Sequence, residues 1–197
     1  MFNVNGWSYK YANKAFVTFL NNILSPQLTT LNRASKGKER FRMLLKEIVE
    51  KKRYAFTEGP LDWREALRQC CKPLEAEGLV DPVYADVIIE NVEKNGPYIV
   101  LVPGVAMPHT TENAQGCNGT GIGFMRCSES VHFDEENPTP DTDAQIFFTL
   151  CSTNQDEHFK NMQRLMAVLT NEEAVEKLKV ATTAEELLEI DAMVGDE

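Results

Sequence analysis

Three strand-like apolar runs lie between two groups of amphipathic segments, and this order constrains the fold more than any other feature of the chain. The runs cover residues 98–102, 120–126 and 144–150. The third is rich in Phe and Ile, as is typical of a buried central strand. Segments with helical spacing of apolar residues cover residues 62–71, 81–94, 156–169, 172–179 and 184–190. Helices, then strands, then helices indicate an α/β domain.

Helix start signals support these boundaries. Asp62 followed by Glu65 has the spacing of a capping box. Pro82 stands where proline is favoured, at the first position of the next helix. Asn171 and Thr183 are predicted to cap the last two helices.

The first 53 residues differ from the rest of the chain in charge. They hold eleven Lys/Arg and three Asp/Glu, a net charge of +8, whereas residues 54–197 carry −18. Helical spacing at residues 16–24 and 38–52 predicts that residues 1–53 form a basic helical N-terminal extension. Residues 54–197 are the predicted main domain. The extension could pack on the acidic body or on a second copy of the chain, so a homodimer is an open possibility.

Composition limits the partners and the compartment. An acidic body disfavours nucleic acid and suits a basic protein partner. Residues 1–6 lack the charged start of a signal peptide, and the most apolar run, residues 98–107, is far shorter than the ~20 residues of a spanning helix. The five cysteines are odd in number and lack CxxC spacing, so we expect reduced packing residues. These features predict a cytoplasmic protein.

Several common site motifs are missing from the sequence. It has no HExxH, no paired CxxC and no GxSxG, so neither a zinc site nor an α/β-hydrolase elbow is predicted. The glycine-rich run 119–123 lacks the lysine of a P-loop and does not open a helix, so we interpret it as close backbone packing. We expect no cofactor and no metal.

His109 follows an apolar strand and a turn, within Pro103-Gly104-Val105-Ala106-Met107-Pro108-His109. Pro108 has a fixed φ and biases Met107 toward extended geometry, so the approach to the histidine is rigid. Thr110 and Thr111 offer hydroxyl and N–H groups that suit an anion. On these residues alone, a structural histidine remains the alternative.

The other two histidines differ in their surroundings. His158 follows a buried strand and lies in the first turn of the next helix, where the helix dipole favours negative charge. A capping-region histidine is the alternative there. His132 alternates with apolar neighbours at a strand end, and we expect an exposed edge residue without a chemical role.

The stretch from Asn95 to His109 closely resembles the enzyme IIA proteins of the bacterial phosphotransferase system. Within the mannitol/fructose superfamily, the resemblance is to the ascorbate-like branch. Asp156-Glu157-His158 before an apolar helix matches the second histidine motif of that family, and Trp63-Arg64-Glu65-Ala66 also matches. The resemblance covers roughly residues 54–191. It implies a mixed central sheet flanked by helices, the enzyme IIA mannitol/fructose-type fold.

The resemblance also implies a function. His109 would accept a phosphoryl group from phospho-HPr and pass it to a cysteine of a cognate enzyme IIB, with the membrane component enzyme IIC involved indirectly. His158 would lie beside His109 and stabilise the phosphoryl group. The chain would then be a phosphotransferase that carries phosphate on histidine during carbohydrate uptake, with ascorbate as the leading substrate.

The sequence departs from the family pattern at three places. The arginine-glutamate pair usual in the mannitol and fructose branches is absent from residues 90–94, which favours the ascorbate-like branch. Thr110 stands where glycine is common, and the basic extension has no counterpart. Two alternatives stay open: a regulatory phosphohistidine module that controls a transcriptional or metabolic partner, and a binding scaffold with vestigial histidines.

Overall fold

The computed structural model describes residues 44–110, 114–134 and 136–195. Within these residues a five-stranded sheet has the order β1-β4-β5-β3-β2. The strands are β1 (Tyr54–Thr57), β2 (Val100–Val102), β3 (Gly104–Ala106), β4 (Gly121–His132) and β5 (Asp143–Cys151). The helices are α4 (Leu44–Glu50), α5 (Trp63–Ala76), α6 (Val83–Asn95), α7 (Gln155–Leu169), α8 (Glu172–Val180) and α9 (Ala184–Gly195).

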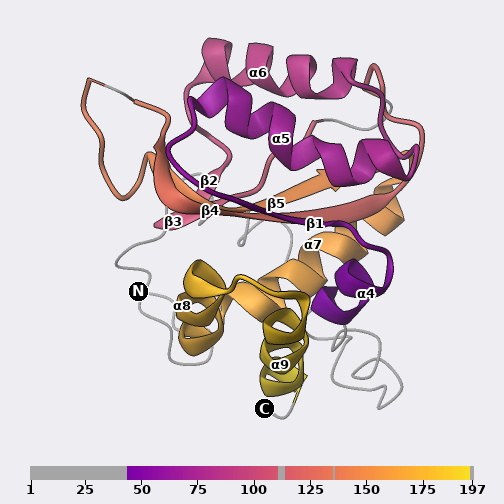
Figure 1. Ribbon diagram of the computed structural model, residues 1–197. Coiled ribbons are helices and arrows are strands. Elements are labelled where there is room, and N and C mark those ends of the chain that lie inside the picture. The colour runs from indigo at the N-terminus through magenta and orange to yellow at the C-terminus, as the bar shows by residue number, and fades with distance from the viewer. Residues whose placement is uncertain (1–43, 111–113, 135, 196–197) are drawn as a thin grey trace, which may run out of the picture.

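The sheet is mixed, as predicted. The β1–β4 and β3–β5 pairs are parallel, whereas β4–β5 and β2–β3 are antiparallel. Helices α5 and α6 cover one face, and α4, α7, α8 and α9 cover the other (Figure 1). The α/β architecture with helices on both faces is therefore confirmed.

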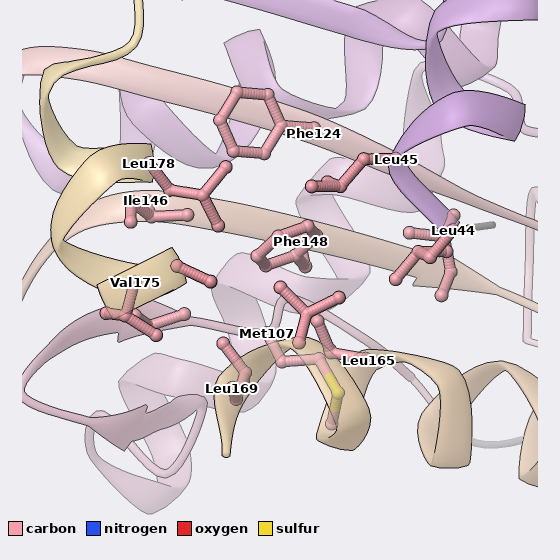
Figure 2. Packing of buried hydrophobic residues seen from close by; sticks show 14 of the residues in the cluster. Leu44, Leu45, Met107, Phe124, Ile146, Phe148, Leu165, Leu169, Val175 and Leu178 are labelled. Atoms are coloured by element: carbon pink, nitrogen blue, oxygen red, sulfur yellow. The ribbon is translucent and has the colours of Figure 1, made fainter. Parts of the chain in front are cut away.

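Each face of the sheet has its own hydrophobic core, because successive side chains of a strand point to opposite faces. On β5, Phe148 packs toward α7 and α8, whereas Phe147 packs toward α5 and α6. Figure 2 shows the first core, where Phe124 and Ile146 lie beside Leu178 of α8. Met107 belongs to this core as well. The segment that leads to His109 is therefore anchored by buried apolar contacts.

The predicted helix starts are confirmed in their main features. Asp62 accepts hydrogen bonds from the N–H groups of Arg64 and Glu65. The Asn171 side chain caps α8 through the N–H of Ala174 at 2.9 Å. Thr183 accepts the N–H of Glu186, and the Glu186 carboxylate accepts the Thr183 N–H at 3.0 Å, a reciprocal capping box. The Glu65 carboxylate accepts from Gln69 at 2.7 Å, which is not the reciprocal bond that the sequence predicted.

The strand pattern differs from the prediction at the edges of the sheet. The run at residues 98–102 forms a strand only over Val100–Val102, and the residues read as a turn form strand β3. Strand β1, at Tyr54–Thr57, was not predicted. Both β1 and β3 are short, so neither shows a clear two-residue period. The predicted close packing of the glycine run is confirmed, because a Cβ at Gly121 would lie 2.8 Å from Leu79 Cδ1.

Helix α4 is packed into the core of the domain. Its Leu44, Leu45 and Ile48 side chains are each at most 1% exposed. The Asp191 carboxylate accepts the Leu45 N–H at 2.8 Å, and Glu47 pairs with Arg164 of α7 at 2.6 Å. The proposed boundary between residues 53 and 54 remains a prediction. The helices expected at 16–24 and at the start of 38–52 lie outside the described residues.

Candidate functional site

Parallel pairing of β3 with β5 brings the segments that follow the two strands to one edge of the sheet. Ala106 pairs with Phe147 in this register. The chain stays beside β5 after β3 ends, since the Leu150 N–H donates to the Pro108 carbonyl at 2.9 Å and His109 forms a parallel bridge with Leu150. Sites in α/β proteins commonly lie beyond the carboxyl ends of strands. His109 is half-buried at this position.

One ring nitrogen of His109 has a defined partner. Its Nδ1 lies 2.8 Å from the Met107 carbonyl oxygen. A carbonyl oxygen can only accept, so Nδ1 carries the proton and Nε2 keeps its lone pair when the ring is neutral. The backbone at Met107–His109 thus determines the tautomer and leaves Nε2 as the ring nitrogen with an available lone pair.

Burial keeps this ring neutral. Desolvation lowers the pKa of His109 below its ordinary value of 6.5, and the hydrogen bond to the Met107 carbonyl opposes this shift. The pKa of His158 is lowered too, first by desolvation and then by the neighbouring His109. Both imidazoles are therefore neutral at pH 7, as nucleophilic attack by a ring nitrogen requires.

His158 reaches the same place from the first turn of α7, the helix that follows β5. The Asn154 side chain caps α7 by accepting the Glu157 N–H at 3.1 Å, and the His158 N–H donates to the Asn154 carbonyl at 2.9 Å. The Ser152 hydroxyl donates to that same carbonyl at 2.6 Å and lies 3.2 Å from the Thr120 hydroxyl. These bonds fix the first turn of the helix, and His158 with it.

The structure brings the two predicted site residues together. The ring centroids of His109 and His158 are 6.2 Å apart, at an interplanar angle of 44°. At this separation, one ring can bear a small anionic group while the other donates a hydrogen bond to it. The two histidines are 49 positions apart in the sequence.

Tyr98 is a neighbour of His109 that the sequence analysis did not identify. Its ring lies edge-on to the imidazole with centroids 5.8 Å apart, and its hydroxyl donates to the His109 carbonyl at 3.3 Å. Its position 11 residues before His109, in an apolar run, gave no sign of this contact. The Thr110 hydroxyl donates to the Tyr84 hydroxyl at 3.4 Å. Thr111 lies outside the described residues.

The remaining candidate groups lie elsewhere or have other properties. His132 ends strand β4, half exposed, and pairs with Asp143 at 2.9 Å. Burial raises the pKa of the Cys127 and Cys151 thiols, the latter to about 12, so both stay protonated. All five cysteines are free thiols.

Among the described residues, no three His, Cys, Asp or Glu side chains are grouped to hold a metal ion. None of the described helices has the length and apolarity to cross a membrane.

The fold defines the class of protein. A solved structure of the mannitol-specific cryptic enzyme IIA from Escherichia coli superposes with a TM-score of 0.64 at 26% identity, over 77% of this chain and 99% of that one. The mixed sheet with its two helical layers is therefore a mannitol-type enzyme IIA fold.

The family follows from the sequence match. Residues 47–191 match the family described as "Phosphoenolpyruvate-dependent sugar phosphotransferase system, EIIA 2". The chain belongs to this family of phosphotransferase-system IIA components, as the resemblance noted above had indicated.

Two further similarities concern substrate and partner. The ascorbate-specific EIIA component of Shigella boydii is 28% identical over 129 residues, 65% of this chain and 81% of that protein. The Escherichia coli complex of the mannitol enzyme IIA with phosphorylated enzyme IIB contains a chain that superposes with a TM-score of 0.58. That chain is 26% identical to this one, over 71% of this chain and 94% of its own length.

Proposed function

We propose that this protein carries a phosphoryl group on His109 Nε2, receives it from phospho-HPr and delivers it to a cysteine of a cognate enzyme IIB. The observation that carries the proposal is the 6.2 Å separation of the His109 and His158 rings at the ends of β3 and β5. Membership of the EIIA 2 family supports the same chemistry. The protein would act in the cytoplasm, where enzyme IIC takes part indirectly as the membrane component.

The bonds and charges of the transfer balance without a further reactant. The Nε2 lone pair of His109 forms the new N–P bond, and the electron pair of the old P–N bond leaves with the donor imidazole. Nδ1 keeps its proton, and the Met107 carbonyl at 2.8 Å stabilises the positive charge that the ring acquires. In the second step a thiolate of enzyme IIB forms a P–S bond, and the N–P electron pair returns to Nε2.

His158 would stabilise the phosphoryl oxygens by donating a ring N–H to them. Positioned donors are the main requirement of phosphoryl transfer, because charge on the phosphoryl oxygens must be balanced in the transition state. The first turn of α7, in which His158 lies, adds the positive end of a helix dipole.

Ascorbate is the proposed sugar substrate of the system. The similarity to the ascorbate-specific component of Shigella boydii, at 28% identity, supports it. The absence of the arginine-glutamate pair before the His109 strand agrees with this branch. The proposed acceptor, enzyme IIB, is supported by the complex in which the similar mannitol enzyme IIA is bound to phosphorylated enzyme IIB.

The test is phosphorylation with purified components. Incubation with phosphoenolpyruvate, enzyme I and HPr should label the protein, and His109→Ala should abolish the label, because Nε2 is the acceptor atom. His132→Ala is the matched control, since His132 pairs with Asp143 at the end of β4 and should keep full labelling. Full labelling of His109→Ala would refute the proposal.

The variant His158→Ala distinguishes acceptance of the phosphoryl group from its transfer to enzyme IIB. We expect this variant to become labelled but to transfer the phosphoryl group onward about tenfold to a hundredfold more slowly, because one donor to the phosphoryl oxygens is lost. Release of label is measured after adding the enzyme IIB domain of an ascorbate system. Wild-type protein that keeps its label in this assay would favour the regulatory role over transport.

A further inference from the structure

A buried hydroxyl lies between the two segments that carry the histidines. The Tyr84 side chain extends from α6 and is 1% exposed. Its hydroxyl donates to the Leu150 carbonyl at 2.7 Å and accepts from the Thr110 hydroxyl at 3.4 Å. Thr110 directly follows His109, and Leu150 is near the end of the strand that leads to His158.

Leu150 is the point where the two segments join. Its N–H donates to the carbonyl of Pro108, the residue before His109, at 2.9 Å. Its carbonyl accepts from Tyr84. The N–H of Leu150 is thus bonded directly to the segment that carries His109. Its carbonyl is linked to the same segment through the hydroxyls of Tyr84 and Thr110.

The Tyr84 hydroxyl can donate its hydrogen bond at every physiological pH. Burial raises the pKa of its hydroxyl well above the ordinary value of 10.0, so the group stays protonated and remains a donor at every physiological pH. A buried hydroxyl without an acceptor costs roughly 1–3 kcal/mol, so the bond from Tyr84 to the Leu150 carbonyl is strongly preferred over an open arrangement. The partners of the hydroxyl are the Leu150 carbonyl and the Thr110 hydroxyl, so it would act on the imidazoles through the segments that carry them.

We propose that Tyr84 is a positioning residue: its hydroxyl, through Leu150 and Thr110, holds the His109 and His158 segments at the separation that phosphoryl transfer needs. The proposal rests on the proposed function of the two histidines. In this proposal, helix α6 influences the geometry of the site formed by His109 and His158 through its residue Tyr84.

Tyr84→Phe tests the proposal, because it removes the hydroxyl and keeps the ring in the core. In the unphosphorylated full-length variant, nitrogen-15 NMR of the imidazoles should show loss of the single Nδ1–H tautomer of His109. The nuclear Overhauser effects between the His109 and His158 rings should weaken. Labelling by phospho-HPr should be about tenfold slower. Thr110→Val, which removes the hydroxyl, should shift the imidazole signals in the same direction. Thr110→Ser, which keeps a hydroxyl, should give the wild-type signals.

Thr149→Val is the control for a merely structural effect. The Thr149 hydroxyl, on the residue before Leu150, is also buried and donates to a main-chain carbonyl, that of Cys70 in α5, at 3.0 Å. We expect similar destabilisation in urea but wild-type imidazole spectra. Wild-type tautomer and ring contacts in Tyr84→Phe would overturn the proposal. The NMR measurement needs no phosphoryl donor, so its result stands even if the wild-type chain fails to become labelled.

Discussion

At the scale of single residues, the site depends on which nitrogen of His109 holds a proton. The bond from Nδ1 to the Met107 carbonyl leaves the lone pair on Nε2, the proposed nucleophile, and desolvation lowers the pKa of the ring. A protonated imidazole has no lone pair to offer. In the proposed function, the pH range in which His109 can accept a phosphoryl group is set by how far burial lowers its pKa.

The lowered pKa gives a prediction with a definite sign. In the folded chain, His109 should titrate with a midpoint below 6.5, and in the urea-unfolded chain near 6.5. Because the folded ring binds a proton less readily, its contribution to stability is present above pH 6.5 and is lost as the pH falls through the folded pKa. Imidazole NMR across pH 5 to 8 measures both midpoints, and a folded midpoint at or above the unfolded one would contradict the prediction.

Local patterns in the sequence indicated the two histidines as candidates but did not indicate their proximity. His109 and His158 each follow an apolar strand, and this much was visible in the local pattern. That β3 lies next to β5 is a property of the sheet order, which no local period encodes. Their expected proximity came from the family resemblance. Tyr98 and Tyr84 were missed because a tyrosine in an apolar run is typical of a core residue, and only the fold shows what its hydroxyl contacts.

At the scale of elements, long amphipathic segments were predictable and short ones were not. The helices α6, α7 and α8 begin within two residues of their predicted starts, because their apolar stripes are long and regular. Of their caps, only that of α8 was predicted: Pro82 precedes α6 without a side-chain hydrogen bond, and Asn154 caps α7. Strand β3 was read as a turn, since Pro103 and Gly104 are turn residues and only three residues are paired. Helix α5 continues past Cys71 to Ala76 in spite of Pro73, with Leu74 fully buried.

The contact between α5, its following loop and β4 leads to a second prediction. Gly121→Ala should lower the free energy of unfolding by about 1–3 kcal/mol, because the new Cβ would overpack the interface. It would lie 2.8 Å from Leu79 Cδ1 and 2.9 Å from Arg53 Nη1. The Arg53 guanidinium is held by both carboxylate oxygens of Glu77, so it cannot move aside freely.

Gly123→Ala is the comparison for this measurement. Its nearest neighbour, Leu74 Cγ, would lie 3.3 Å from the added carbon, a milder contact. Urea denaturation of the two variants should show a clearly larger loss for Gly121→Ala. An equal or smaller loss would mean that the strand and the loop after α5 can separate more easily than the packing indicates.

At the scale of the whole molecule, α4 belongs energetically to the domain that follows it. Its three buried aliphatic side chains fill the core beneath β4, and Glu47 links Arg53 to Arg164 of α7. The charge contrast between residues 1–53 and 54–197 therefore does not coincide with the packing. Charge patterning reports on solvation, whereas burial depends on a few apolar positions of one helical face.

Two truncations test this relation. A chain that begins at residue 44 should keep α4, and a chain that begins at residue 54 should lose roughly 5 kcal/mol or more relative to it, as Leu44, Leu45 and Ile48 leave the core. Urea unfolding of both chains gives the difference. If the two urea unfolding curves had equal midpoints and equal slopes, residues 44–53 would contribute nothing to the stability of the domain.

The partner of His109 Nδ1 is a main-chain oxygen, and this has an evolutionary consequence. A side-chain substitution cannot remove that acceptor atom and can change the tautomer only by moving the backbone through Met107 and His109, as we propose for Tyr84→Phe. In the proposed function, substitutions of exposed residues around the imidazoles would change the recognition of donor and acceptor proteins while the reactive nitrogen stays the same. If recognition of partner proteins and reactivity of His109 are separate in this way, the same fold could be used in many transport systems.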